Sequence, residues 1–208
     1  VRQLPPVTKP ELMEHFDDVI TDPAVRKADV QKHIADLGNL GKPFMGKYMV
    51  WTTSGTTGTP GIFLQDKNWD IVISAVNVLR IGGEWYNWDV IKGMMAAGGN
   101  SASIFAGNGH FFGVTMLERQ RQSNRSRAKR IQLIPVTLPI SEIVQRLNTF
   151  QPAMFAGYAS ALGLLAQEQL EGRLNIHPSI VISSAEPFSN ENRALIQQAF
   201  GVPPRNNY

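Results

Sequence analysis

Short apolar stretches alternate with longer helical patterns through most of this chain, and this alternation restricts its fold more than any other feature. The apolar stretches lie at 93–97, 102–106, 131–136, 152–156 and 180–184. Apolar residues at helical spacing are found at 111–121, 140–150, 158–170 and 189–199. Strands that alternate with helices of ten or more residues form βαβ units. The sequence therefore predicts an α/β fold with a mostly parallel sheet flanked by helices, whose ligands bind at the carboxyl ends of the strands.

The beginning of the chain follows a different pattern. Thr8 is expected to cap a first helix, and a second helix is expected to end near Gly38. Short strands are predicted at 48–51 and 62–64, with a turn between them. Helical spacing then predicts a helix over 68–84, which a pair of glycines closes.

Length and composition are those of an ordinary globular protein. The 208 residues are enough for one substantial domain, and we expect a helical lead-in over 1–46 and an α/β core over 47–208. No cysteine is present, which excludes disulfides and thiolate metal sites and fits a cytoplasmic protein. The longest mainly apolar run, 155–166, is too short to cross a bilayer, so we expect no membrane partner. The sequence indicates no particular oligomeric state.

The segment from Trp51 to Gly61 gathers glycines and hydroxyl side chains in the turn of the expected hairpin. Gly55 and Gly58 are free to adopt backbone angles that point successive N–H groups at an anion. Further donors are the hydroxyl groups of Ser54, Thr56, Thr57 and Thr59. No lysine stands where a Walker loop requires one. These residues favour a polyphosphate site, and a hydroxyl-rich hairpin turn is the alternative.

The run Thr53-Ser54-Gly55-Thr56-Thr57-Gly58-x-Pro60 closely resembles the phosphate-binding loop of the adenylate-forming superfamily, which includes acyl-CoA and aryl-CoA ligases. Many members carry lysine after the proline, where this chain has Gly61, or before it, where this chain has Thr59. The absence of lysine points to the phenylacetate–CoA ligase and coenzyme F390 synthetase-like branch, whose lead-in also resembles Leu4 to Lys9. The resemblance implies a phosphate-binding role for Thr53, Ser54, Gly55, Thr56, Thr57 and Gly58.

A histidine between glycine and two phenylalanines follows the expected strand at 102–106. Taken alone, such a histidine is more typical of a buried structural residue than of a catalyst. The resemblance implies that His110 is catalytic and donates to the substrate carboxylate or the acyl phosphate. It also implies an acid pocket formed by His110, Phe111, Phe112 and Tyr158. Tyr158 fits a core tyrosine at a helix start equally well. The remaining histidines have no ligand spacing and are expected to be surface or structural residues: His15, His33 and His177.

The strand at 180–184 runs into small residues, a carboxylate and a proline, which predicts a strand-to-helix turn capped by Ser189 or Asn190. In the phenylacetate–CoA ligase branch the similar segment holds adenine. The resemblance therefore implies adenine contacts from Ser184, Ala185, Glu186 and Pro187, with Tyr208 resembling the tyrosine that stacks on the base. Beyond that tyrosine the superfamily has a Glu for Mg²⁺, an Asp for the ribose and a Lys on a mobile domain. None of these can be assigned, so the resemblance implies that 1–208 is a partial N-terminal adenylation domain without the C-terminal mobile domain.

The function implied by the resemblance is that of an ATP-dependent acid–thiol ligase. A carboxylate, expected to be an aryl or other apolar acid, attacks the α-phosphorus of ATP, and coenzyme A or another thiol then displaces AMP. ATP, Mg²⁺ and coenzyme A are the expected cofactors, and this fragment is expected to be inactive alone. The alternative is a nucleotide-binding pseudoenzyme or remnant module that lacks ligase activity.

Six arginines and lysines lie within twelve residues from Arg119 to Arg130, although the net charge of the chain is only +3. Clustered arginines can neutralise nucleic-acid phosphates. Against this reading, the run contains no aromatic residue to stack on a base. We favour a solvated helix end that leads into the next strand, and expect no nucleic-acid partner. Contact with the phosphates of coenzyme A or ATP is a third reading.

Overall fold

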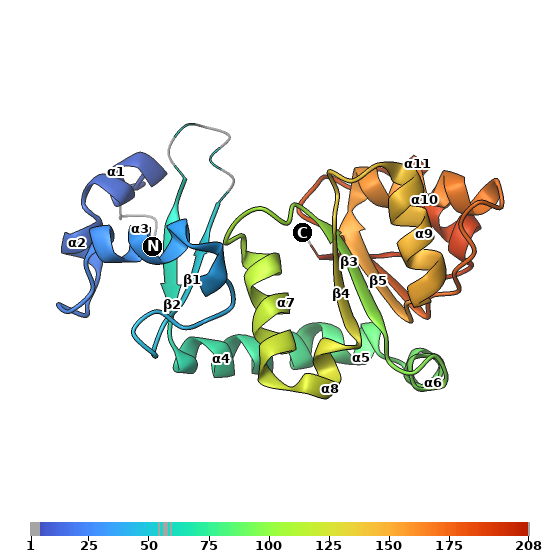
Figure 1. Ribbon diagram of the computed structural model, residues 1–208, viewed down its shortest axis with the longest axis horizontal. Coiled ribbons are helices and arrows are strands. Elements are labelled where there is room, and N and C mark those ends of the chain that lie inside the picture. The colour runs from blue at the N-terminus through green and yellow to red at the C-terminus, as the bar shows by residue number, and fades with distance from the viewer. Residues whose placement is uncertain (1–4, 54, 56–57, 59, 208) are drawn as a thin grey trace. The chain divides into compact units, whose positions relative to one another are not determined.

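The computed structural model describes residues 5–53, 55, 58 and 60–207 (Figure 1). The chain divides into two compact units. Unit 1 contains Val1–Ile71 and Asn108–Arg119, and unit 2 contains Val72–Gly107 and Gln120–Tyr208. The expected boundary between a lead-in and a core at residue 46 stays a prediction.

Unit 1 begins with short helices. These are α1 (Lys9–Glu14), α2 (Phe16–Val19), α3 (Lys27–Ala35) and the 3₁₀ helix η1 (Leu37–Asn39). The Thr8 hydroxyl accepts from the Glu11 backbone N–H, and the Glu11 carboxylate accepts from the Thr8 backbone N–H at 2.8 Å, which completes a capping box. The predicted cap is therefore confirmed, and the second helical segment ends near Gly38 as a 3₁₀ turn.

A hairpin forms the centre of unit 1. Strand β1 (Met49–Thr52) pairs antiparallel with β2 (Ile62–Gln65), so that Thr52 lies opposite Ile62. Apolar side chains from α1, α2 and α3 pack against one face of this hairpin. The buried members of that core are Met13, Phe16, Val25, Val30, Phe44, Val50 and Ile62. The hairpin and its connecting loop agree with the sequence prediction.

Unit 2 contains a five-stranded sheet in which every neighbouring pair of strands is parallel. Its strands are β3 (Ser101–Phe105), β4 (Ile131–Pro135), β5 (Met154–Tyr158), β6 (Ile180–Ser184) and β7 (Arg205–Asn207). The spatial order is β4-β3-β5-β6-β7. Because parallel strands end at the same edge of a sheet, the loops after β3, β5 and β6 are neighbours. The predicted α/β class with a mostly parallel sheet flanked by helices is confirmed.

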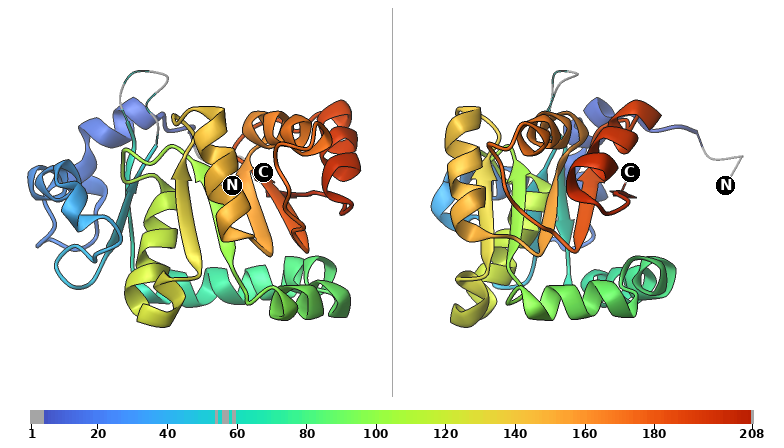
Figure 2. Two further views of the ribbon diagram at one scale, coloured as in Figure 1. Left: turned by 45° about the vertical axis from the view of Figure 1, so that its right-hand side comes forward. Right: turned by 90° about the vertical axis from the view of Figure 1, so that its right-hand side faces the viewer.

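Helices cover both faces of this sheet (Figure 2). On one face lie α9 (Ile140–Phe150), α10 (Ala159–Leu170) and α11 (Asn190–Phe200). Ile104, Leu147, Phe155, Leu162 and Ile196 are fully buried in the core between these helices and the strands. On the other face, α5 (Gly83–Trp85) and α6 (Trp88–Ala96) form a smaller cluster in which Trp85 packs with Ile180 and Ile182 of β6.

One predicted strand is wrong: residues 93–97 belong to α6 and to the residue after it. The Asn87 side chain accepts from the Val90 N–H at 3.0 Å and starts this helix. The run from Gly93 to Ala97 contains methionine and alanine but no β-branched residue, which suits a helix. A five-residue apolar run does not by itself distinguish a strand from part of a helix.

The helix expected over 68–84 also differs in detail. It is built from α4 (Lys67–Asn77), a π-helical turn at Val78–Gly82 and α5. Gly82 and Gly83 keep right-handed angles, with φ of −59° and −69°, so the chain stays helical through them. The remaining helices are α7 (Phe112–Ser123) and α8 (Arg125–Ala128). Among the described residues, every helix lacks either the length or the apolar character that crossing a membrane would require.

Candidate functional site

The described part of the hydroxyl-rich loop has the backbone angles that its glycines predict. Gly55 and Gly58 have φ values of +68° and +111°, and the Gly58 N–H donates to the Gly55 carbonyl at 2.8 Å. At the base of the loop, the Thr53 hydroxyl accepts from the Gly61 N–H at 2.8 Å. Such positive-φ turns direct backbone N–H groups to one side, as in anion-binding nests. The other predicted phosphate-binding residues lie outside the described residues: Ser54, Thr56 and Thr57.

The segment around His110 runs beside the strand that leads into this loop. The Thr52 N–H donates to the His110 carbonyl at 2.7 Å, and Thr52 and Phe111 form a parallel bridge. The start of the loop and the His110 segment are therefore joined by backbone pairing, although they lie more than fifty residues apart in the sequence. Unit 1 thus brings together two of the segments that the sequence analysis singled out.

The imidazole of His110 is buried, with 3% of the residue exposed. Its Nε2 lies 3.4 Å from the Asp36 carbonyl, and because a carbonyl only accepts, Nε2 carries the hydrogen. Burial lowers the pKa of His110, the Asp36 backbone contact raises it, and the neighbouring His33 lowers it. His110 is therefore mainly neutral near pH 7, and Nδ1 is the ring nitrogen that takes no part in the contact with Asp36.

His33 is a neighbour of His110 that the sequence analysis placed among the surface or structural histidines. The two ring centroids are 5.9 Å apart in an edge-on arrangement, and the His33 ring also meets Phe44 at 5.5 Å. His33 Nε2 is buried and has no hydrogen-bond partner within the described part of the chain. His33 lies on α3, 77 positions before His110 in the sequence. No pattern among neighbouring residues could therefore have predicted the contact between the two rings.

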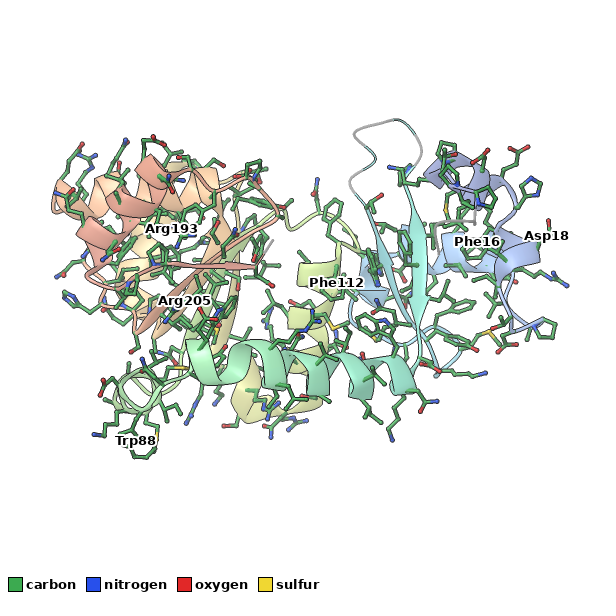
Figure 3. All side chains as sticks on the ribbon, turned by 180° about the vertical axis from the view of Figure 1, so that it is seen from behind. Phe16, Asp18, Trp88, Phe112, Arg193 and Arg205 are labelled. Carbon is green, nitrogen blue, oxygen red and sulfur yellow. The ribbon has the colours of Figure 1, made fainter. Side chains whose placement is uncertain are left out.

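The aromatic residues after His110 line one side of the hairpin. Phe112 meets Trp51 of β1 at 5.2 Å and Trp69 of α4 at 6.3 Å, both edge-on. Trp51 in turn stacks on Phe63 at 4.5 Å. Phe112, 42% exposed, lies at the start of α7 (Figure 3), and Phe111 is half-buried. These rings form an aromatic cluster beside the hairpin, and a role of Phe111 and Phe112 in binding an acid stays a prediction.

Tyr158 is the predicted acid-pocket residue that unit 2 contains. It ends β5, and its hydroxyl accepts from the Ala106 N–H just beyond β3 at 3.4 Å. Its ring meets Phe105 edge-on, with centroids 5.1 Å apart. Tyr158 is half-buried at the carboxyl edge of the sheet, where ligands bind in folds of this kind.

The predicted adenine segment lies at the same edge of the sheet. Ser184 ends β6 opposite Tyr158 of β5, and Ala185 has φ +63°, a left-handed angle that is uncommon for alanine. The Glu186 carboxylate accepts from the Ser160 N–H at 2.8 Å and from the Ser160 hydroxyl at 3.1 Å. Pro187 follows in the turn to α11, which Ser189 caps by accepting from the Asn192 N–H. Tyr208 lies outside the described residues.

The basic run is divided between ion pairing and exposure. Arg119 pairs with Asp70 inside unit 1. Arg125, Arg127, Lys129 and Arg130 are exposed on α8 and in the turn before β4. This agrees with the solvated helix end that the sequence favoured. Among the described residues, no three side chains of His, Asp or Glu gather closely enough to hold a metal ion.

Solved structures show which fold these units belong to. The crystal structure of 2-hydroxyisobutyryl-CoA ligase in the postadenylation state with 2-HIB-AMP matches 98% of this chain, with a TM-score of 0.54 and 19% sequence identity. An open conformation of that ligase, in complex with 2-HIB-AMP and CoA, matches 97% of the chain with a TM-score of 0.51 and 19% identity. The chain spans 38% of the length of the ligase. A scan against protein-family models finds no match to this sequence, and neither does a search of curated proteins.

At 19% identity, the likeness establishes the fold and not the activity. The α/β arrangement with its parallel sheet corresponds to part of a CoA ligase of the adenylate-forming type.

Proposed function

We propose that this chain is the N-terminal portion of an ATP-dependent acid–thiol ligase of the phenylacetate–CoA ligase branch. In the first step a carboxylate oxygen attacks the α-phosphorus of ATP, the bond to the β-phosphate breaks, and pyrophosphate leaves. In the second step the sulfur of coenzyme A or another thiol attacks the acyl carbonyl, AMP leaves, and the thiol proton passes to solvent. An aryl or other apolar acid is the proposed substrate, and the cytoplasm is the proposed location.

The pairing of Thr52 with the His110 segment is the observation that carries this proposal. It holds a phosphate-type loop and a histidine-bearing segment side by side through a backbone hydrogen bond of 2.7 Å. An adenylation site needs the phosphates and the carboxylate close together, because the reaction joins them. The match to part of a CoA ligase fold supports the same assignment.

The loop is proposed to hold the phosphates by its backbone and hydroxyl groups. Gly55 and Gly58 supply the positive-φ turn, and Thr53, Ser54, Thr56 and Thr57 supply hydroxyl donors. Donors that are fixed before the reaction stabilise the charge that develops on the departing pyrophosphate. The loop carries no lysine, so its stabilisation of the phosphates would come from dipoles and not from a side-chain cation.

His110 is proposed to face the carboxylate or the acyl phosphate through Nδ1. Because Nε2 gives its hydrogen to Asp36, Nδ1 donates only when the ring is protonated. A donor role for His110 would therefore require uptake of one proton when the anion binds. Phe111, Phe112 and Tyr158 are the proposed walls of the acid pocket, and Ser184 to Pro187 with Tyr208 are the proposed adenine segment.

Mg²⁺ is implied by the resemblance, but the described residues do not fit it. They contain no group of three His, Asp or Glu side chains that could hold the ion. A nucleotide-binding module that lacks ligase activity is the second candidate.

Binding of ATP to the 208-residue chain, measured by calorimetry, tests the phosphate loop. We expect Gly55→Ala to weaken ATP binding by about tenfold or more, equivalent to about 1.4 kcal/mol. A Cβ atom at Gly55 would lie 2.9 Å from Pro60 Cγ and would strain the left-handed backbone. Gly46→Ala is the matched control, because Gly46 has the same φ of +68° but a Cβ there would meet no described atom within 4 Å.

Two results would contradict the proposal. One is a wild-type chain that does not bind ATP. The other is equal ATP affinity in Gly55→Ala and Gly46→Ala, which would show that the loop does not hold the phosphates.

A further inference from the structure

Glu186 accepts hydrogen bonds from Ser160, a contact that the sequence did not predict. Each of its carboxylate oxygens accepts a hydrogen bond from Ser160, one from the backbone N–H at 2.8 Å and one from the hydroxyl at 3.1 Å. Ser160 lies in the first turn of α10, 26 residues earlier in the sequence. Glu186 therefore joins the turn after β6 to the helix that follows β5.

The contact supplies α10 with an N-terminal partner from another element. The N-cap residue, Tyr158, uses its hydroxyl to accept from Ala106. A carboxylate at a helix N-terminus satisfies an otherwise free N–H group and interacts favourably with the helix dipole. Such charge-assisted hydrogen bonds are stronger than those between neutral groups.

A second contact attaches the other end of the same turn to α10. The Asn192 side-chain N–H donates to the Ala159 carbonyl at 2.6 Å. Gly163 leaves room for this approach, because a Cβ atom there would lie 2.4 Å from Asn192 Oδ1. The segment from Ala185 to Asn192 is thus held against the first turn of α10 at two points.

Directly before the first of these points lies the strained backbone of Ala185, whose φ is +63°. A left-handed alanine persists only where the surrounding structure holds it. The Glu186 contact lies directly beside Ala185 and orients the backbone groups of that turn.

We infer that Glu186 is a positioning residue that ties the adenine-facing turn to the Tyr158–Ser160 wall of the acid pocket, and that it does not itself contact the base. This inference rests on the proposed function, because it takes Ser184 to Pro187 as the adenine segment. Both carboxylate oxygens of Glu186 already accept hydrogen bonds from Ser160. The adenine base would therefore contact the backbone of the turn after β6. Any rearrangement of the acid-pocket wall would then move the adenine segment with it.

Adenosine and AMP binding to the 208-residue chain, together with thermal unfolding, tests this inference. We expect Glu186→Ala to weaken both ligands by about tenfold, the scale of a lost charge-assisted contact. Glu186→Gln keeps an acceptor for the Ser160 N–H, and we expect it to restore affinity to within about threefold of wild type. Pyrophosphate affinity should be unchanged in both variants, because pyrophosphate is proposed to bind the loop in unit 1.

Two further variants keep the test decisive. Glu142→Ala, which removes an exposed glutamate paired with Arg146 on α9, is the matched control and should leave adenosine binding unchanged. Ser160→Ala removes one of the two hydrogen bonds with little disturbance, and should weaken adenosine by about threefold. Its effect should be absent in the Glu186→Ala background, because the two residues act as a pair.

The outcomes separate this inference from the proposed function. A wild-type chain that binds neither adenosine nor AMP overturns the proposed function. A wild-type chain that binds both, with unchanged affinity in Glu186→Ala, overturns only the positioning role. Affinity that Glu186→Gln fails to restore, combined with unchanged adenosine binding in Ser160→Ala, would overturn it as well, because the carboxylate charge itself would then be what the nucleoside requires.

Discussion

At the scale of single residues, His33 and His110 are two partly or fully buried histidines whose rings lie side by side in unit 1. Burial is the main cause that lowers the pKa of both rings. Contacts near Asp36 raise both pKa values, while Lys42 acts on His33 in both directions, through its backbone and its charge. Two imidazolium ions this close would also repel each other. Both rings are therefore neutral at pH 7.

This arrangement predicts a loss of stability in mild acid. The pKa of each histidine is lower in the folded chain than its ordinary value of 6.5. The unfolded chain therefore binds more protons below pH 6.5, and the free energy of unfolding decreases as the pH falls. We expect urea unfolding measured from pH 8 to pH 5 to show this decrease, and His33→Phe to reduce its slope.

His177→Gln provides the comparison for this experiment, because His177 is exposed. An equal pH dependence in wild type and His33→Phe would show that His33 does not contribute to the acid sensitivity.

At the scale of elements, the turn after η1 packs directly against α7. Gly41 has φ +77°, and a Cβ atom there would lie 2.7 Å from the Arg119 backbone nitrogen and 2.8 Å from the Glu118 carbonyl carbon. A side chain at this position would therefore push the turn away from the helix. The same stretch of chain carries His33 and Asp36, so the close packing at Gly41 also secures the surroundings of His110.

We expect Gly41→Ala to be clearly more destabilising than Gly46→Ala. The left-handed angle alone should cost about 1 kcal/mol at Gly46. At Gly41 the overlap with the α7 backbone should add about 2 kcal/mol. Chemical unfolding of the two variants measures this difference. Equal unfolding free energies of the two variants would mean that the turn at Gly41 moves away from α7 without loss of stability. The packing at Gly41 would then not stabilise the surroundings of His110.

At the scale of the whole molecule, the chain spans 38% of the ligase whose fold it matches. Binding and turnover are therefore separate questions for this polypeptide. Binding of a nucleotide is not sufficient for adenylation, because the transferred charge must also be neutralised.

We accordingly expect the 208-residue polypeptide to bind ATP without turning it over. Incubation with ATP, phenylacetate and Mg²⁺ should release pyrophosphate no faster than a mixture without protein. A continuous pyrophosphate assay checks this, with a complete aryl-CoA ligase as the positive control. Pyrophosphate release that depends on the acid would contradict the expected inactivity, and would support the ligase reaction itself.

Much of the fold was predictable because its signals are local. The capping box at Thr8, the cap at Ser189 and the extents of α9, α10 and α11 follow from residues within a few positions of one another. The hairpin loop was equally evident, since its glycines and threonines are contiguous. The parallel sheet followed from the alternation of strands and helices alone.

Other features depended on the tertiary structure. Residues 93–96 are the end of a helix and not a strand, because the Asn87 cap starts a helix that continues through the apolar run. His33 contacts His110, which lies 77 positions later in the sequence, and Glu186 accepts hydrogen bonds from Ser160, which lies 26 positions earlier. Periodicity and capping act over a turn or two of chain, so the sequence determined the type and order of most elements. Contacts between distant residues depend on how those elements pack, and only the folded chain decided which side chains meet at the candidate site.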